Sequence, residues 1–146
     1  MVEEQRALAV RYYNQAWDLI DKSGRSPADD RRLLTLAMAS RALWDDIGGD
    51  EQWITGDWQV SHVAALTGHP GLALEFAASA YERAATADVP LWLKASTCEG
   101  LARAHAVAGH AAERDAWVVK ARELLERVND SDDRAVIERQ LASIGD

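Results

Sequence analysis

Apolar residues recur along this chain at intervals of three and four positions, which is the spacing of one face of an α-helix. Val10, Tyr13 and Trp17 follow this pattern near the start of the chain and predict a first helix over residues 3–22. Further segments of the same period follow at about 26–47, 51–66, 70–86, 91–107, 111–128 and 131–144. No segment alternates with the period of two that is typical of a β-strand. The pattern therefore predicts an all-α protein of about seven helices.

Short turn signals separate these segments. Ser26 is a good N-cap residue, and Pro27 follows it at the first helical position. Gly68 and Gly109 each stand at the expected end of a helix. The connections are short, so consecutive helices are expected to be antiparallel. We expect a single domain over residues 1–146, with helical hairpins at about 3–47, 51–86 and 91–128 and a capping helix at 131–144.

An internal repeat relates the hairpins to one another. Residues 63–80 align without gaps on residues 104–121, at an offset of 41 positions that places Gly68 on Gly109. The first hairpin fits more loosely and places Gly24 on Gly68, at an offset of 44 positions. A helix–turn–helix unit with this period predicts hairpins that stack on their neighbours as in a solenoid.

These hairpins resemble the tetratricopeptide (TPR) class of helical repeats. With Gly68 as the family's turn glycine, Ala73 and Ala80 occupy its small positions on the second helix. Leu101 and Ala102 match its large-then-small pair on the first helix. The resemblance extends to a group of bacterial TPR-like proteins. It implies three stacked TPR-like hairpins plus a C-terminal capping helix, wound into a right-handed α-α superhelix.

The same resemblance implies a binding surface, because the first helix of each TPR-like hairpin lines the concave face. When the family's groove positions are carried over by the turn glycines, they fall four residues apart on each of these helices. They are Asn14 and Asp18, Trp58 and His62, and Glu99 and Arg103, with Arg11, Thr55 and Ser96 one turn earlier. This strip predicts contacts to a ligand or partner. The alternative is an ordinary solvated face, with Glu99 and Arg103 as an i,i+4 ion pair.

Six tryptophans are many for a chain of 146 residues. Those that lie on apolar stripes are expected in the core: Trp17, Trp44 and Trp117. The others lie near helix starts: Trp53, Trp58 and Trp92. For this second group we expect packing between hairpins, with a pocket wall or a dimer contact as the alternatives.

The charge balance narrows the range of partners. The chain has a formal net charge of −8 and a pI near 4.9, so nucleic acid and anionic lipid would repel it. No apolar run approaches the roughly 18–20 residues of a membrane helix. The N-terminus lacks the basic and apolar regions of a signal peptide, and the single cysteine, Cys98, has no partner for an internal disulfide. These features predict a cytoplasmic protein.

Motifs that would signal catalysis or metal binding are absent from the sequence. His62 and His69 are separated by a turn, and His105 and His110 are five apart, which is off the i,i+4 spacing of two ligands on one helix. The sequence contains no nucleophile elbow, phosphate-binding loop or dinucleotide motif. We therefore expect no metal, no cofactor and no enzyme activity.

The sequence predicts a protein-interaction or scaffolding module. It would bind a peptide or a partner helix in its concave groove, or associate with itself as a homodimer. The first alternative is a small-molecule-binding sensor with Trp58, His62 and Arg103 around a pocket. The second is an enzyme that uses His62 with Glu99 or Asp18 in a cleft between helices.

Overall fold

The computed structural model describes residues 1–145 and confirms the all-helical prediction for them. The helices are α1 (Val2–Ile20), α2 (Pro27–Leu43), α3 (Asp50–Leu66), α4 (Pro70–Thr86), α5 (Leu91–Val107), α6 (Ala111–Leu125) and α7 (Ser131–Ala142). Residue 146, the last of the predicted domain, lies outside the described residues. None of the helices within residues 1–145 combines the length and the apolar character that a membrane span requires.

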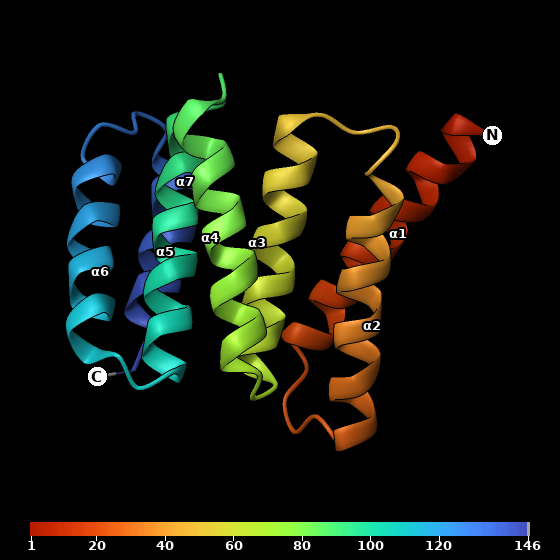
Figure 1. Cartoon of the computed structure of the whole chain (residues 1–146), viewed down its shortest axis with the longest axis horizontal. Helices are drawn as coiled ribbons and strands as arrows, with labels where there is room; N and C mark the ends of the chain where they lie inside the picture. Colours follow the sequence, from red (N-terminus) through yellow and green to blue (C-terminus); the bar gives the residue numbers. More distant parts are fainter. Residues whose placement is uncertain (146) are drawn as a thin grey trace.

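The helices form a row of antiparallel hairpins. The most extensive contacts join α1 to α2, α3 to α4 and α5 to α6, and further contacts join each hairpin to the next. Figure 1 shows this row from α1 and α2 at one end to α6 at the other, with α7 behind α5. The predicted hairpin stack with a C-terminal helix is therefore confirmed, while the hand of its superhelix stays a prediction.

Local sequence signals explain several of the helix ends. Gly24, Gly68 and Gly109 adopt positive φ angles of 67°, 82° and 81° in the turns within the hairpins, a conformation that glycine adopts without steric cost. Ser26 and Asp29 form a reciprocal capping box at the start of α2, with bonds of 3.1 and 3.0 Å.

Two helices end three or more residues earlier than the sequence predicts. The helix α2 ends at Leu43 and α6 at Leu125, where the pattern predicts ends near 47 and 128. At both ends the backbone tightens into i→i−3 hydrogen bonds, such as the one from the Trp44 N–H to the Arg41 carbonyl at 3.2 Å. The apolar period continues through these turns because their side chains still face the core.

Asp57 joins three helices, and its burial could not be read from the periodicity. Its side chain is 3% exposed, and its two oxygens accept hydrogen bonds from Arg41 Nε of α2 at 2.7 Å and from Ser79 Oγ of α4 at 2.9 Å. Gly56 makes room for the arginine, because a Cβ at that position would lie 2.6 Å from Arg41 Cδ. This buried ion pair links the first hairpin to the second.

The two acidic partners of Arg41 offer a test of this joint. Asp57→Ala removes the buried partner of the Arg41 guanidinium, which is itself largely buried. The change is expected to lower the free energy of unfolding by about 3 kcal/mol. Asp45→Ala removes a partner of the same arginine that is 63% exposed, and is expected to cost less than about 0.5 kcal/mol. Urea unfolding followed by circular dichroism measures both. Equal losses in the two variants would show that the Asp57 pair does not hold the hairpins together.

Candidate functional site

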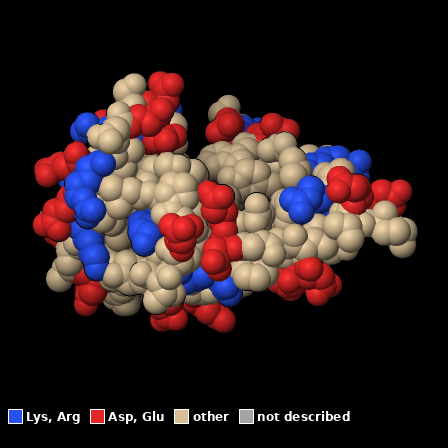
Figure 2. Space-filling view, turned by 90° about the horizontal axis from the view of Figure 1, so that it is seen from above, with Lys and Arg blue, Asp and Glu red and all other residues tan. Residues whose placement is uncertain are grey.

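A groove runs along the inner face of α1 and consists of three adjoining hollows. The central pocket, of about 180 Å³, lies between α1, α3, α5 and α7. At one end lies a hollow of about 300 Å³ whose lining includes Glu51, here called the acidic end. At the other lies a hollow of about 330 Å³ whose lining includes Arg103 and Arg139, here called the arginine end. Figure 2 shows the surface indented between the two halves of the row, with uncharged side chains in the indentation and acidic ones on both flanks.

Shared lining residues join these three hollows into one groove. The central pocket has Tyr13 in common with the acidic end and Trp17 in common with the arginine end. Along α1 the groove passes Val10, Tyr13, Trp17 and then Asp21, about one residue per helical turn. At a rise of about 1.5 Å per residue this span is roughly 16 Å long. The groove is therefore long enough for several residues of an extended chain.

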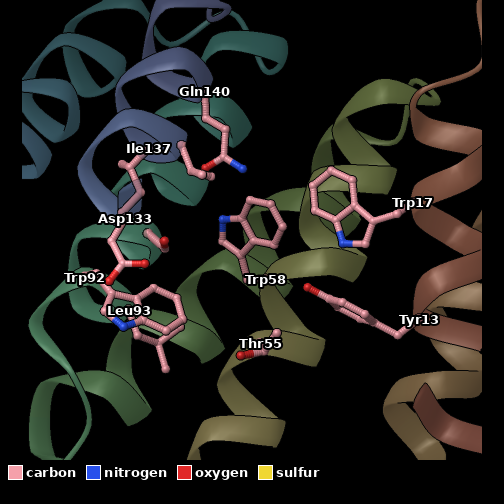
Figure 3. Close-up of a pocket in the computed structure, with 11 residues that line it drawn as sticks. Tyr13, Trp17, Thr55, Trp58, Trp92, Leu93, Asp133, Ile137 and Gln140 are labelled. Atoms are coloured by element: carbon pink, nitrogen blue, oxygen red, sulfur yellow. The ribbon is translucent and has the colours of Figure 1, made fainter. Parts of the chain in front are cut away.

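Four aromatic rings line the central pocket. They belong to Tyr13, Trp17, Trp58 and Trp92. Trp17 and Trp58 stack with their centroids 5.8 Å apart and an interplanar angle of 25°. Figure 3 shows Trp58 in the middle, with the two rings of α1 on one side and Trp92 and the side chains of α7 on the other. Among the described residues that line this pocket, Asp133 is the only charged one.

A buried carboxylate holds Trp58 in place. Glu99 is 0% exposed, and its Oε2 accepts a hydrogen bond of 3.0 Å from the indole N–H of Trp58. The other oxygen accepts a hydrogen bond of 2.9 Å from Arg103 Nε. Gly100 allows the indole to approach α5, because a Cβ there would lie 3.1 Å from Trp58 Cδ1. Burial raises the pKa of Glu99, while Arg103 and the hydrogen bond from Trp58 act in the opposite direction.

Arg103 also fastens α7 over the groove. Its Nη2 donates to the Gln140 carbonyl and to Ser143 Oγ, both at 2.8 Å. A cation at the C-terminal end of a helix satisfies carbonyls that have no partner within the helix. Ile137 and Leu141 anchor the same helix through buried apolar contacts near α5 and α6. One connected set of bonds therefore joins α3, α5 and α7 and sets the width of the groove.

His62 extends the aromatic stack toward the arginine end. Its ring lies 4.9 Å from that of Trp58 at an interplanar angle of 21°. The side chain is 7% exposed, and its buried Nδ1 has no hydrogen-bond partner within residues 1–145. Burial, with smaller contributions from Arg103 and Arg25, lowers the pKa of His62 to about 3. The imidazole is therefore neutral at pH 7.

These groups have little of the chemistry that a catalytic site requires. A histidine whose pKa is about 3 is a weak general base, and both oxygens of Glu99 are already occupied by donors. Burial raises the pKa of Cys98 to about 11, so its thiol stays protonated. Within residues 1–145 no group of three or more His, Cys, Asp or Glu side chains is placed to hold a metal ion.

The structure brings together most of the predicted strip on α3 and α5. Thr55, Trp58 and Ser96 line the central pocket, and His62 and Arg103 line the arginine end. Glu99 belongs to the same cluster, but it lies fully buried behind the wall and supports Trp58. Its ion pair with Arg103 is therefore a buried one that positions the groove, and not the ordinary solvated pair of the alternative interpretation.

The residues predicted on α1 lie one position out of register with the groove. Arg11, Asn14 and Asp18 are exposed and line none of the three hollows. The residues that face the groove are Tyr13 and Trp17, each one position before a predicted residue.

The turn glycines are not equivalent in the two hairpins. Gly24 lies four residues beyond the end of α1 at Ile20, whereas Gly68 lies two residues beyond the end of α3 at Leu66. The turn after α1 is longer, so its glycine does not mark the same position on the preceding helix. Tyr13 and Trp17 are spaced four apart, and this aromatic spacing could have indicated which face of α1 lines the groove.

Trp17, Trp58 and Trp92 have roles other than the ones expected from the sequence. Trp17 is half-buried and lines the pocket, although its apolar stripe predicted a place in the core. Trp58 and Trp92 form pocket walls, which is the alternative role that the sequence left open. Trp53 packs between hairpins as predicted, because its indole N–H donates to the Trp44 carbonyl at 2.9 Å and Arg83 of α4 lies over its ring.

Comparison with known proteins leaves family membership open. No protein-family model matches the chain, and neither a curated protein nor a solved structure matches it. The resemblance to TPR-like proteins and the bacterial origin therefore stay predictions.

The lowered pKa of His62 predicts a pH-dependent stability. The unfolded chain protonates this residue near its ordinary pKa of about 6.5, whereas the folded chain does so only near a pKa of about 3. Between these values the unfolded state binds more protons, so the free energy of unfolding decreases as the pH falls, by at most about 1.4 kcal/mol per pH unit. Between pH 7.5 and 5.5 the loss from this residue is expected to be about 1.4 kcal/mol.

Two measurements check this expectation. Urea unfolding of His62→Phe, which keeps an aromatic ring in the stack, is expected to lack this part of the pH dependence. In the intact protein, the NMR signal of the His62 ring is expected to remain unshifted from pH 8 to pH 5. A titration midpoint near the ordinary pKa of histidine would contradict the burial of a neutral imidazole.

Proposed function

We propose that this protein is a non-enzymatic interaction module that binds an extended segment of a partner in the groove between α1 and α7. The observation that carries this proposal is the central pocket, which is lined by four aromatic rings and lies at the middle of a groove about 16 Å long. Aromatic side chains in such hollows contribute most of the energy of many protein–protein interfaces.

The dimensions of the groove favour an extended segment over a helix. The α7 helix stands opposite α1 and is tied down at its C-terminal end by Arg103. The hollows that remain have volumes of about 180 to 330 Å³, which suits individual side chains. A helix with its side chains is about 10–12 Å wide and would require α7 to move. A segment in extended conformation can instead place side chains into the hollows in turn.

The outer surface gives less support to self-association. The most exposed large apolar side chains lie on several different helices: Met1, Val2, Val10, Met38, Val107, Val119 and Val136. Two of these, Val10 and Val136, belong to the groove itself. Single exposed apolar residues are ordinary on a protein surface, so they do not define a dimer interface.

A small-molecule sensor is the second candidate, and the enclosure of the central pocket is what favours it. Four helices surround this pocket, and its volume of about 180 Å³ is similar to that of a cavity of about 150 Å³ that holds a benzene ring. The enzyme alternative gains no such support, because His62 is neutral and both oxygens of Glu99 are held by donors.

Filling the pocket tests the proposed function. Thr55→Phe introduces a ring into the lining of the central pocket, while Thr35→Phe makes the same change at an exposed position on α2. Peptides that bind the intact protein are first selected from a random display library, then synthesised and titrated calorimetrically. We expect Thr55→Phe to weaken their binding at least about tenfold, which is 1.4 kcal/mol, and Thr35→Phe to leave it unchanged.

Other outcomes of the same experiment have a clear meaning. Selected peptides that bind Thr55→Phe as tightly as the intact protein would show that the groove is not the binding surface. If the library yields no binder, and a screen of small molecules finds one that Thr55→Phe excludes, the sensor candidate replaces the peptide-binding module. Circular dichroism of both variants confirms that they fold.

A further inference from the structure

We propose that the group held in the central pocket is an organic cation, namely the alkylammonium end of a lysine-type side chain on the bound segment. This inference rests on the proposed function and specifies the chemistry of its anchor. It combines the charge of the lining, the number of aromatic rings and the charges along the rest of the groove.

The charge of the lining points to a cation. Asp133 is half-buried and is the only charged residue among the described residues that line the pocket. Its carboxylate forms no salt bridge and accepts no hydrogen bond within residues 1–145, whereas its backbone N–H is used by the Asp130 cap. Figure 3 shows its side chain beside Trp92, on the wall opposite Tyr13 and Trp17. A neutral anchor would cover this carboxylate without compensating its charge, and an anion would be repelled by it.

The aromatic rings favour the same chemistry. The face of an aromatic ring is negative and attracts a cation within about 6 Å, and tryptophan is the strongest of the three aromatic residues in this respect. The pocket contains three tryptophans and one tyrosine. The hydroxyl groups of Tyr13, Thr55 and Ser96 also line it, and hydroxyl oxygens can accept the hydrogen bonds of an ammonium group.

The charges along the rest of the groove do not oppose a cation. At the acidic end, Glu51 is the only charged residue of the described lining. At the arginine end, the charge of Arg103 is matched by its ion pair with Glu99, and Asp21 lies in the same hollow as Arg139. The formal net charge of −8 and the acidic flanks of the indentation in Figure 2 would also draw a basic segment toward this surface.

Three matched peptides test the inference. Each is an acetylated and amidated pentapeptide of glycines with one central residue, which is lysine, trimethyllysine or the uncharged norleucine. The tryptophan indole N–H signals of the protein are followed by NMR as each peptide is added. We expect at least one of the two cationic peptides to bind about tenfold or more tightly than the norleucine peptide, because burying a cation among aromatic faces contributes up to about 2 kcal/mol.

Two variants with the same change in net charge assign this preference to the pocket. Asp133→Asn removes the charge of the lining and is expected to abolish the advantage of the cationic peptides. Asp132→Asn removes a neighbouring charge from the first turn of α7 that lies outside the lining, and is expected to preserve it. Equal preference for the cation in both variants would overturn the inference, because general attraction to an acidic surface would then explain it.

The inference and the proposed function can fail separately. If the three peptides bind with equal affinity, or if none binds while library-selected peptides do bind in the groove, the anchor is not a cation. Neither result bears on whether the groove is the binding surface, which Thr55→Phe tests. The proposed function itself fails when Thr55→Phe leaves the binding of selected peptides unchanged, or when only small molecules bind the pocket.

Discussion

The carboxylate of Glu99 is fully buried, so the surrounding side chains must supply the hydrogen bonds that water would otherwise provide. Burying an ionised group costs several kcal/mol unless its partners are well placed. Trp58 and Arg103 provide these partners from two different helices. The same indole then stands at the centre of the pocket, and the same guanidinium holds the end of α7. The geometry of the groove therefore follows from the need to compensate one charge.

Charges in this molecule fall into two groups that differ in their pairing. Those removed from water are paired: Asp57 meets Arg41 and Ser79, and Glu99 meets Arg103 and Trp58. Such pairs fix one helix relative to the next. Asp133, in contrast, is half-buried and has no such partner within residues 1–145, so it does not hold helices together. Its position among four aromatic rings is better explained by the ligand that the pocket binds.

The fold could be predicted because it depends on local signals. Helical period and turn glycines act over a few residues, and Gly68 and Gly109 mark equivalent turns in the repeat. The groove was harder to predict. Gly24 and Gly68 lie at different distances from the preceding helix, so the turn glycine was a poor guide to the register of α1. The burial of Glu99 depends on Trp58, which lies 41 positions away in the chain. Sequence reasoning also missed Asp133, because only tertiary packing places α7 opposite α1.

Two opposite sides of the groove are formed by α1 and α7, the first and last of the described helices. The α1 helix packs mainly on α2, and α7 mainly on α5, so each has fewer partners than the helices in the middle of the row. Elements with few packing partners open most readily in native-state fluctuations. An occupant that touches both helices would link their opening, since binding stabilises only the state in which both are folded. Slower amide hydrogen exchange in α1 and α7 together would then report that the groove is filled.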